Sequence, residues 1–447
     1  MNKQETRMTE GCIWKILVRF ALPLFIGKLF QQLYNVVDSL VVGNFCGDKA
    51  LAAVSSSGSL CFLLIGFFEG VFVGASVIIS HRYGAKDEKG VDRAIHTTLW
   101  FSIVAGIILT LFGILFTPKI LRLMGTPGNI LPQSVDYFRI YCMGLLSLTI
   151  YNTMNGIYQA LGDSKRPLYY LMLASVVNVV LDLMFVGVFR WGVKGAAFAT
   201  IIGQTFSVIL GMRHLMSGKF IVQINWRHIV PDFQILKQVL SYGIPSGVQN
   251  SVIAVGNVVV QSNINAFGEL AMAGCGSHSK IQGFVFLPIM SITMALTTFV
   301  GQNLGAGNKS RVKKGAVQGI FMSVVMAELF GVFVYMCSPQ LLSIFTKDSV
   351  VIAYGTDQAR TEALFYALLA FSHAAAAVLR GAGKAMIPMA VMLIDWCFIR
   401  IAFITIVVRY IPNIKVVFVA YPITWTISTI LFILFLWKGN WLGKKSL

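Results

Sequence analysis

Residues 99–116 read LWFSIVAGIILTLFGILF, and this stretch decides the class of fold. It contains no charged residue, and about 20 such residues form one helix that crosses the hydrocarbon core of a bilayer. Two further blocks, Leu168–Phe189 and Val416–Trp437, have similar length and few or no charges. A backbone in lipid must satisfy its own hydrogen bonds, so these segments are expected to be helices. The sequence therefore predicts an all-α polytopic membrane protein.

The composition of the whole chain agrees with this class. Of 447 residues, 56% are apolar and only 12% are charged, whereas roughly 25% are charged in a soluble protein. This excludes a soluble enzyme, a disordered chain and a collagen-like fibre. The net charge of +18 would suggest nucleic-acid binding in a soluble protein. Here the basic residues lie between apolar blocks, as in cytoplasmic loops, so no nucleic-acid partner is expected.

Twelve apolar stretches are long enough to cross a bilayer. They lie near 16–43, 51–80, 94–116, 134–161, 168–189, 193–215, 236–266, 270–301, 315–337, 361–381, 385–409 and 415–437. If the N-terminus is inside, the inner segments hold 22 Lys and Arg residues and the outer segments only eight. Because Lys and Arg concentrate in cytoplasmic loops, we expect both termini in the cytoplasm.

The second half of the chain repeats short motifs of the first half. Leu22-Pro23 recurs as Ile244-Pro245 at an offset of 222, and Tyr83-Gly84-Ala85 and Gly162…Pro167 recur as Leu304-Gly305-Ala306 and Gly383…Pro388 at an offset of 221. Six is an even number of spans, so both halves begin on the same side and form parallel repeats, two pseudo-symmetric six-helix lobes. We expect an N-terminal lobe at 1–216, a cytoplasmic linker at 217–235 and a C-terminal lobe at 236–447. Such symmetry is typical of alternating-access carriers.

A series of motifs runs through almost the whole chain. In order they are Ala21-Leu22-Pro23, Gln31-Gln32-x-x-Asn35-x-x-Asp38 with Gly43, Ala50-Leu51-Ala52-Ala53, Tyr83-Gly84-Ala85, Gln159-Ala160-Leu161-Gly162-Asp163, Gly243-Ile244-Pro245 and Leu379-Arg380-Gly381. Each motif alone is weak, but their order and spacing resemble the multidrug and toxic compound extrusion (MATE) transporters. The resemblance implies twelve helices in two lobes and cation-driven export of mostly cationic, lipophilic compounds.

Polar residues inside three apolar spans are the candidate coupling site. They are Gln31, Asn35 and Asp38 in the first span, Asn178 and Asp182 in the fifth, and Thr200 and Gln204 in the sixth. Their spacing places them on one face of each helix. A carboxylate near the bilayer centre costs about 2.5–3.5 kcal/mol, so its presence there is by default a hypothesis of function. Counting about 1.5 Å per residue from the outer turns brings Asp38, Asp182 and Thr200 to one level in the outer half of the membrane.

Two carboxylates surrounded by amide and hydroxyl oxygens suit a hard cation such as Na+, and they suit a proton equally well. The resemblance implies that Asp38, Asn178, Asp182 and Thr200 form the first-lobe cation site. The alternative for Asp182 is a structural hydrogen-bonding role. Beyond the coupling ion, no cofactor is expected, because the seven scattered cysteines form neither a metal motif nor a disulfide framework.

The second lobe departs from some branches of the family. Those branches carry acids on helices seven and ten, whereas Ser246–Ile264 and Ala363–Leu379 contain none. This departure favours the DinF-like and related Gram-positive branch, with coupling in the first lobe. Asp395 and Arg400 are expected to be structural ion pairs or side chains near helix ends. His373 is expected to be a satisfied polar residue, with a proton relay as the alternative.

Pro23 and Pro245 each interrupt a span and allow a kink. A static kink and a bend that responds to Asp38 protonation both remain open. Gln31, Asn35, Glu69 and Gln204 are expected to line a cavity, and the alternative for Glu69 is a pair with Lys28.

The function that the sequence favours is that of a secondary active antiporter, not an enzyme, in the cell membrane of a bacterium. Inward H+ or Na+ would drive outward movement of amphipathic, mostly cationic organic compounds, and a monomer suffices. Gly381-Ala382-Gly383-Lys384 lacks the spacing and the Ser or Thr of a nucleotide-binding P-loop. The alternatives are a lipid-linked saccharide flippase of related two-lobe architecture and a non-transporting membrane sensor. The flippase is disfavoured because its pyrophosphate would need a cationic cavity, whereas the first lobe is acidic.

Overall fold

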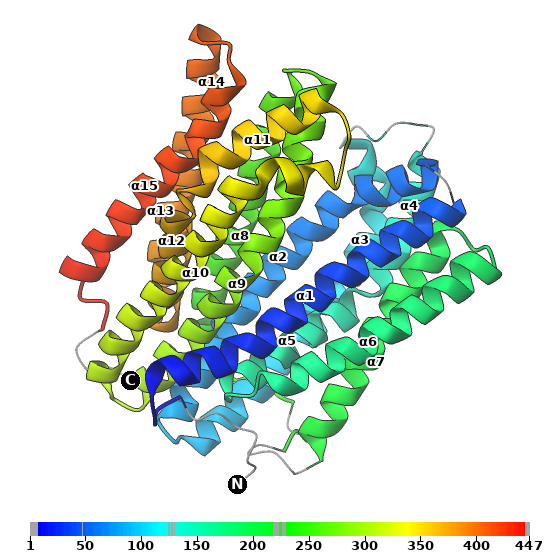
Figure 1. Ribbon diagram of the computed structural model, residues 1–447. Coiled ribbons are helices and arrows are strands. Elements are labelled where there is room, and N and C mark those ends of the chain that lie inside the picture. Colours follow the sequence, from blue (N-terminus) through cyan, green and yellow to red (C-terminus); the bar gives the residue numbers. More distant parts are fainter. Residues whose placement is uncertain are drawn as a thin grey trace. The chain divides into compact units, whose positions relative to one another are not determined.

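The computed structural model describes residues 8–46, 48–123, 126, 128, 130–217, 223–225 and 229–442 (Figure 1). Both chain ends and parts of the predicted linker 217–235 lie outside these residues. The first half contains α1 (Ile13–Cys46), α2 (Asp48–Gly84), α3 (Glu88–Leu123), α4 (Leu131–Met143), α5 (Leu145–Ala160), α6 (Lys165–Asp182), the π-helix η1 (Leu183–Val188) and α7 (Val193–Met216). The second half contains α8 (Phe233–Asn265), α9 (Glu269–Gly305), α10 (Lys309–Ser343), α11 (Ser349–Ala363), α12 (Tyr366–Gly381), α13 (Met386–Met392), the π-helix η3 (Leu393–Ile399), α14 (Arg400–Tyr410) and α15 (Ile414–Lys438).

The predicted all-α membrane fold is confirmed. Within the described part of the chain, eight helical segments are individually long and apolar enough to cross a membrane, and α11 with α12, bent by 56°, makes a ninth. The helices α1 and α8 and the pair α4 and α5, interrupted at Gly144, complete the twelve predicted spans. Each half of the chain therefore supplies six.

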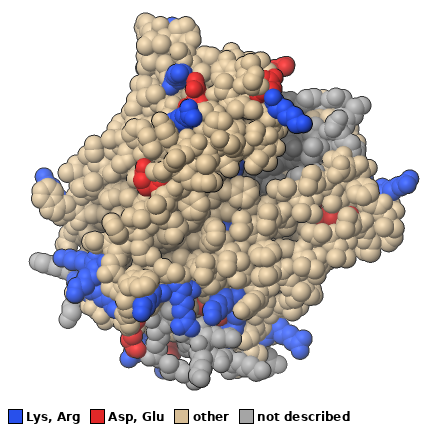
Figure 2. All heavy atoms as spheres, viewed as in Figure 1, with Lys and Arg blue, Asp and Glu red and all other residues tan. Residues whose placement is uncertain are grey.

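The outer surface of these helices is apolar, as a lipid environment requires. Leu115 on α3 is 69% exposed and Leu329 on α10 is 68% exposed. Figure 2 shows wide surfaces without Lys, Arg, Asp or Glu. Patches of this extent are rare on soluble monomers, and in a bilayer they face acyl chains.

Packing divides the chain into two compact units. One contains Ile26–Gly243, and the other contains Arg7–Phe25 with Ile244–Leu447. Both crossings fall inside a helix, in α1 close to Pro23 and in α8 close to Pro245. The predicted lobes were defined by the order of the spans along the chain, whereas these two units are defined by which residues pack together. Thus α1 contributes residues to both units.

The first unit has a core built from α2, α3 and α5. Its buried residues include Ile79, Ile95 and Tyr158. The segment between α7 and α8 is attached to α3, because the backbone N–H of Asp232 donates to Thr97 Oγ1 at 3.1 Å. This attachment explains why the start of α8 belongs to the first unit.

In the second unit, the start of α1 packs against α9 and α10. Leu17 and Phe20 are fully buried in the cluster that contains Phe299 of α9. The chain before α1 is also fixed, since the backbone N–H of Met8 donates to Gln302 Oε1 at 3.2 Å and the amide of Asn303 donates to the Met8 carbonyl at 3.0 Å. These contacts account for the assignment of residues 7–25 to the second unit.

The sequence repeat recurs in the backbone. Gly162 and Gly383, 221 residues apart, both follow a helix and have φ values of 88° and 75°. At the next repeated turn, Lys86 has φ 59° and Gly307 has φ 73°. The left-handed region is readily available to glycine and costs energy for lysine, so the turn geometry is retained even where the residue type is not.

Candidate functional site

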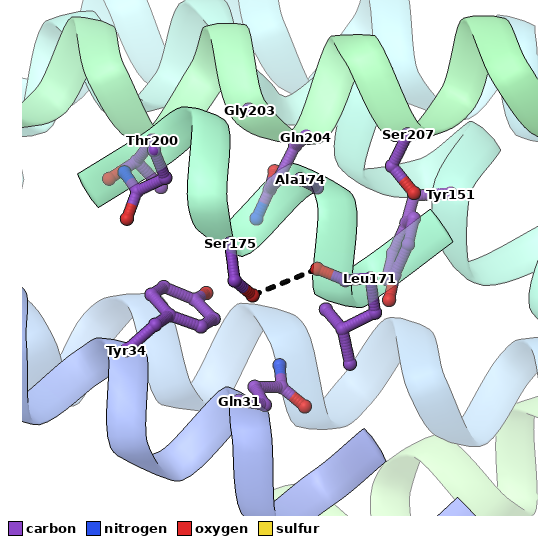
Figure 3. A pocket seen from close by; sticks show the side chains of 11 residues that line it. Gln31, Tyr34, Tyr151, Leu171, Ala174, Ser175, Thr200, Gly203, Gln204 and Ser207 are labelled. Carbon is purple, nitrogen blue, oxygen red and sulfur yellow. Dashed lines mark hydrogen bonds between the residues drawn. The ribbon is translucent and has the colours of Figure 1, made fainter. Parts of the chain in front are cut away.

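A small cavity lies in the first unit among α1, α5, α6 and α7 (Figure 3). Its lining residues are Gln31, Tyr34, Tyr151, Leu171, Ala174, Ser175, Asn178, Thr200, Gly203, Gln204 and Ser207. Its volume is about 30 Å³. One water needs about 10–15 Å³ of such space, whereas pockets for drug-sized ligands span about 300–1,000 Å³. The cavity therefore has room for an ion or one or two waters, and not for an organic compound.

Close packing of α6 against α7 brings their polar side chains together. A Cβ on Gly203 of α7 would lie 3.1 Å from the carbonyl oxygen of Ala174 and 3.1 Å from the Cβ of Asn178, both on α6. Only glycine permits this approach without displacement of a neighbour. It places Thr200 and Gln204, one turn apart on α7, beside Asn178 at the cavity wall.

The carboxyl groups of Asp38 on α1 and Asp182 at the end of α6 lie close enough to interact electrostatically. Asp182 is fully buried, and neither of its oxygens has a hydrogen-bond donor. One buried oxygen of Asp38 lacks a donor as well. Two ionised carboxylates repel each other, and buried charges without partners are unfavourable. This arrangement calls for a proton or a cation.

The amide and hydroxyl groups nearby have free acceptor capacity. The side-chain oxygen and nitrogen of Asn178 are buried without a partner. Thr200 Oγ1 donates to the carbonyl of Ala196 at 3.1 Å, so its own lone pairs remain available. These oxygen atoms suit a hard monovalent ion, which prefers oxygen ligands.

The other predicted lining residues divide into two groups. Gln31 and Gln204 line the cavity, and in Figure 3 Gln31 lies across the cavity from the side chains of α6 and α7. Asn35 is exposed and is not among the lining residues. Glu69 is also absent from the lining, because Lys28 Nζ donates to Glu69 Oε1 at 3.1 Å. Of the two roles predicted for Glu69, cavity lining or a pair with Lys28, the structure therefore shows the pair with Lys28.

Sequence reasoning missed Tyr34, Tyr151, Ser175 and Ser207. Tyr34 lies three residues after Gln31 and four before Asp38, and Ser207 lies three after Gln204. Helical spacing therefore placed both on the faces already identified. In the sequence, a tyrosine inside an apolar span is interpreted as a packing residue. The structure shows that the side chains of Tyr34 and Tyr151 line the cavity.

The second unit holds buried charges of its own. Glu362 is fully buried and accepts hydrogen bonds from Gln282 at 2.9 Å and Gln358 at 2.8 Å. Arg400 is 2% exposed, donates to Thr424 Oγ1 at 2.8 Å and lies over the ring of Tyr421 at 4.5 Å. Among the described residues, Arg400 makes no direct ion pair, so the hydroxyl and the aromatic ring hold it instead.

The proline and histidine positions complete the comparison with the predicted residues. Pro23 lies inside α1 and Pro245 inside α8, as expected for interrupted spans. His373 lies edge-on to Phe286 and to Trp396, with ring centroids 4.8 and 5.2 Å away.

Comparison with known proteins gives a consistent result. The family model MatE matches residues 23–184 and again 245–411, and each match begins at one of the two repeated prolines. The chain is 28% identical over 443 residues to the probable multidrug resistance protein YoeA of Bacillus subtilis, with 97% of this chain and 96% of that protein covered. It is 29% identical over 395 residues to the probable multidrug resistance protein YpnP of the same organism, with 88% of each covered. A solved outward-facing structure of a multidrug resistance MATE transporter of the MOP superfamily has a TM-score of 0.92 and 25% identity, with full coverage of both chains.

Proposed function

Since the chain belongs to the MatE family of multidrug efflux transporters, we propose that inward H+ or Na+ drives its export of amphipathic, mostly cationic organic compounds. The exporter works by alternating access in a bacterial cell membrane, as a monomer with both termini in the cytoplasm. The single observation that carries the coupling proposal is the buried contact between Asp38 and Asp182, whose oxygens lack donors.

The contact explains how an ion changes the structure. Without a bound ion the two carboxylates repel, and a proton or Na+ between them removes the repulsion. Binding therefore favours close approach of α1 and α6, and release favours their separation. The polar cavity lined by Asn178, Thr200 and Gln204 is too small for an organic compound, so we infer that ion and compound occupy different places.

Helix α1 is the element through which the ion acts. It carries Asp38 in the first unit, and its first residues pack in the second unit. Pro23, near the crossing, lacks the N–H that would continue the helical hydrogen bonds. A change of charge at Asp38 therefore acts on a helix that packs in both units and that lacks one helical hydrogen bond near Pro23.

The flippase alternative receives less support. Its substrate carries a pyrophosphate, which requires several cations in one place. In the first unit, Lys28 is already neutralised by Glu69 at 3.1 Å, and the polar cavity contains no Lys or Arg.

Transport in proteoliposomes tests the proposal. Uptake of a fluorescent organic cation would be followed under an H+ gradient and, separately, under a Na+ gradient. One gradient is expected to drive flux in the wild type and in Asp136→Asn, a matched control whose carboxylate pairs with Lys194 at an exposed position. Flux is expected to be lost in Asp38→Asn and Asp182→Asn. Gradient-driven flux that survives both substitutions would overturn the coupling site, and no flux in folded wild type would overturn cation export.

A further inference from the structure

The first turns of α3 hold the segment that joins α7 to α8. Of this segment, the structure describes residues 223–225 and 229–232. The backbone N–H of Asn225 donates to His96 Nε2 at 3.2 Å, and the backbone N–H of Asp232 donates to Thr97 Oγ1 at 3.1 Å. Two neighbouring side chains of one helix therefore fix two points of the connection between the halves of the chain.

His96 must be neutral for its contact with Asn225 to form. A backbone N–H can only donate, so Nε2 carries a lone pair and the ring proton lies on Nδ1. The Nδ1–H then donates to the carbonyl oxygen of Asp92, which lies 2.9 Å away. The side chain of His96 is buried, with 2% of the residue exposed, so water does not readily replace either partner.

Protonation of His96 changes which contacts the ring can make. A cationic imidazole carries an N–H on both nitrogens, so Nε2 would face the N–H of Asn225 as a second donor, and that hydrogen bond would be lost. The cation has another partner, because an oxygen of the Asp92 carboxylate lies 3.3 Å from Nδ1. The neutral ring thus holds the joining segment, and the cationic ring pairs with Asp92. Histidine is the side chain that changes charge between about pH 5 and 8.

The elements that surround this end of α3 carry further titratable or charged groups. They are Arg93 on α3 itself, His81 and Arg82 on α2, Tyr158 on α5, His214 on α7, Asp232 in the joining segment and Lys237 on α8. Arg93 and Asp232 pair with each other at 3.6 Å, and Arg82 lies 3.9 Å from the carboxylate of Asp87. The carboxylate that pairs with His96 is that of Asp92, so Asp92 favours the cationic ring and Asn225 favours the neutral one.

The contact with Asn225 supports the start of α8. Ile224, the preceding residue, is buried in the core of the first unit beside Ile95. Asp232 caps α8, since its Oδ1 accepts the backbone N–H groups of Gln234 at 3.0 Å and Ile235 at 3.2 Å. The first residues of α8 pack in the first unit, whereas the helix from Ile244 onward packs in the second. The charge of His96 therefore acts on the segment that connects the two halves.

We propose that His96 is an acid-sensitive latch, whose protonation releases Asn225 and loosens the segment between α7 and α8. In the orientation proposed above, this end of α3 faces the cytoplasm, so the latch responds to cytoplasmic acidification. A carrier whose halves move against each other is less restrained when the latch is open. The latch lies apart from Asp38 and Asp182 in the sequence and does not depend on which ion is coupled to export.

Hydrogen–deuterium exchange of the purified full-length protein in nanodiscs tests the proposal. Peptides that contain residues 223–225 are followed by mass spectrometry between pH 5.5 and 8, and each rate is corrected for the pH dependence of chemical exchange. In the wild type, protection of these residues is expected to fall about two- to tenfold as the pH is lowered, the range for loss of one hydrogen bond. In His96→Gln, the amide oxygen accepts the N–H of Asn225 without titrating, so protection is expected to stay at its high-pH level.

Three further variants separate His96 from the groups around it. Asp92→Asn removes the carboxylate that stabilises the cationic ring, so the midpoint of the loss of protection should move to lower pH. His214→Gln removes a second histidine at this end of the first unit and should keep the wild-type response. His96→Leu offers no acceptor and should give low protection at every pH.

Other outcomes overturn the inference. Protection that does not change with pH in the folded wild type would refute the latch, and so would a pH response that persists in His96→Gln. If His96→Gln does not fold, Asp92→Asn decides, because that side chain is 43% exposed; a midpoint that stays in place or rises would show that another group titrates. These measurements need no transport, so they can fail while the export function stands, and absence of gradient-driven flux would refute that function while leaving the latch intact.

Discussion

Substitution of Asp182 by Asn is expected to make the protein more stable while abolishing coupled transport. The wild-type carboxylate is fully buried, contacts Asp38 and has no donor on either oxygen. Asparagine removes one of the two charges and supplies N–H groups to the unpartnered oxygen of Asp38. The substitution therefore removes the repulsion and adds a hydrogen bond to a charged group.

The size of the effect follows from that bond. A hydrogen bond to a charged group contributes about 1.5–3 kcal/mol. For a domain of roughly 200 residues, each kcal/mol moves the unfolding midpoint by about 2–4 °C. The first unit is of that size, so we expect the midpoint of ion-free Asp182→Asn to rise by about 3–12 °C.

Buried thiols provide the assay. Cys142 is buried in the first unit and Cys275 in the second, so a thiol-reactive fluorogenic dye reports their exposure during a thermal ramp. Bound ligand stabilises the folded state by about 2.7 kcal/mol at a hundred times its dissociation constant. The wild-type midpoint should therefore rise when the coupling ion is added, and the midpoint of Asp182→Asn should not.

Two variants separate this explanation from a structural role. Asp182→Leu removes the charge without adding donors, so it should gain less than Asp182→Asn. Asp136→Asn breaks an exposed ion pair with Lys194, which is worth about 0–1 kcal/mol. A midpoint for Asp182→Asn below that of the wild type would show that the carboxylate is a structural hydrogen-bonding group and would refute the reasoning.

Three further predictions concern the surroundings of the site. Glu69→Gln leaves the half-exposed Lys28 without its partner. The stability loss should therefore be about 1 kcal/mol or less, and transport should be retained. Loss of transport would contradict the assignment of Glu69 to an ion pair. Gly203→Ala should lower the free energy of unfolding by about 1–3 kcal/mol, as overpacking does, and should impair coupling, because its Cβ would displace α6. The control Gly276→Ala has open space around its Cβ and should be neutral or stabilising. Equal effects of the two substitutions would refute the packing argument. If Asp38 controls bending of α1, disulfide crosslinking of engineered cysteine pairs across α1 should differ between Asp38→Asn and the wild type, and identical patterns would support a static kink.

Sequence periodicity predicted the spans because the cost of burying charge in lipid is a local property of the chain. Leu99–Phe116 needs no knowledge of its neighbours to be recognised as a span. The repeated turns at Gly162 and Gly383 were also visible, since both need a residue that tolerates positive φ. Packing between segments distant in the sequence could not be predicted in this way. No pattern in residues 8–25 indicates that they contact α9.

The candidate site was predictable to the extent that helical spacing determines which side chains share a face. Asn178 and Asp182, and Thr200 and Gln204, were identified in this way. Asn178, Thr200 and Gln204 line the cavity, whereas Asp182 interacts with Asp38 and is not among the lining residues. Helix rotation relative to neighbours is set by packing, so Asn35 could not be separated from Gln31 in advance.

The coupling claim is tested most directly by running the transporter in reverse. Proteoliposomes are loaded with a fluorescent organic cation, no ion gradient is imposed, and H+ or Na+ movement is recorded as the compound leaves. The account predicts that downhill movement of the compound drives one of these ions in the opposite direction, and that Asp38→Asn and Asp182→Asn abolish this ion flux. Movement of the compound through wild type with no accompanying flux of either ion would contradict it.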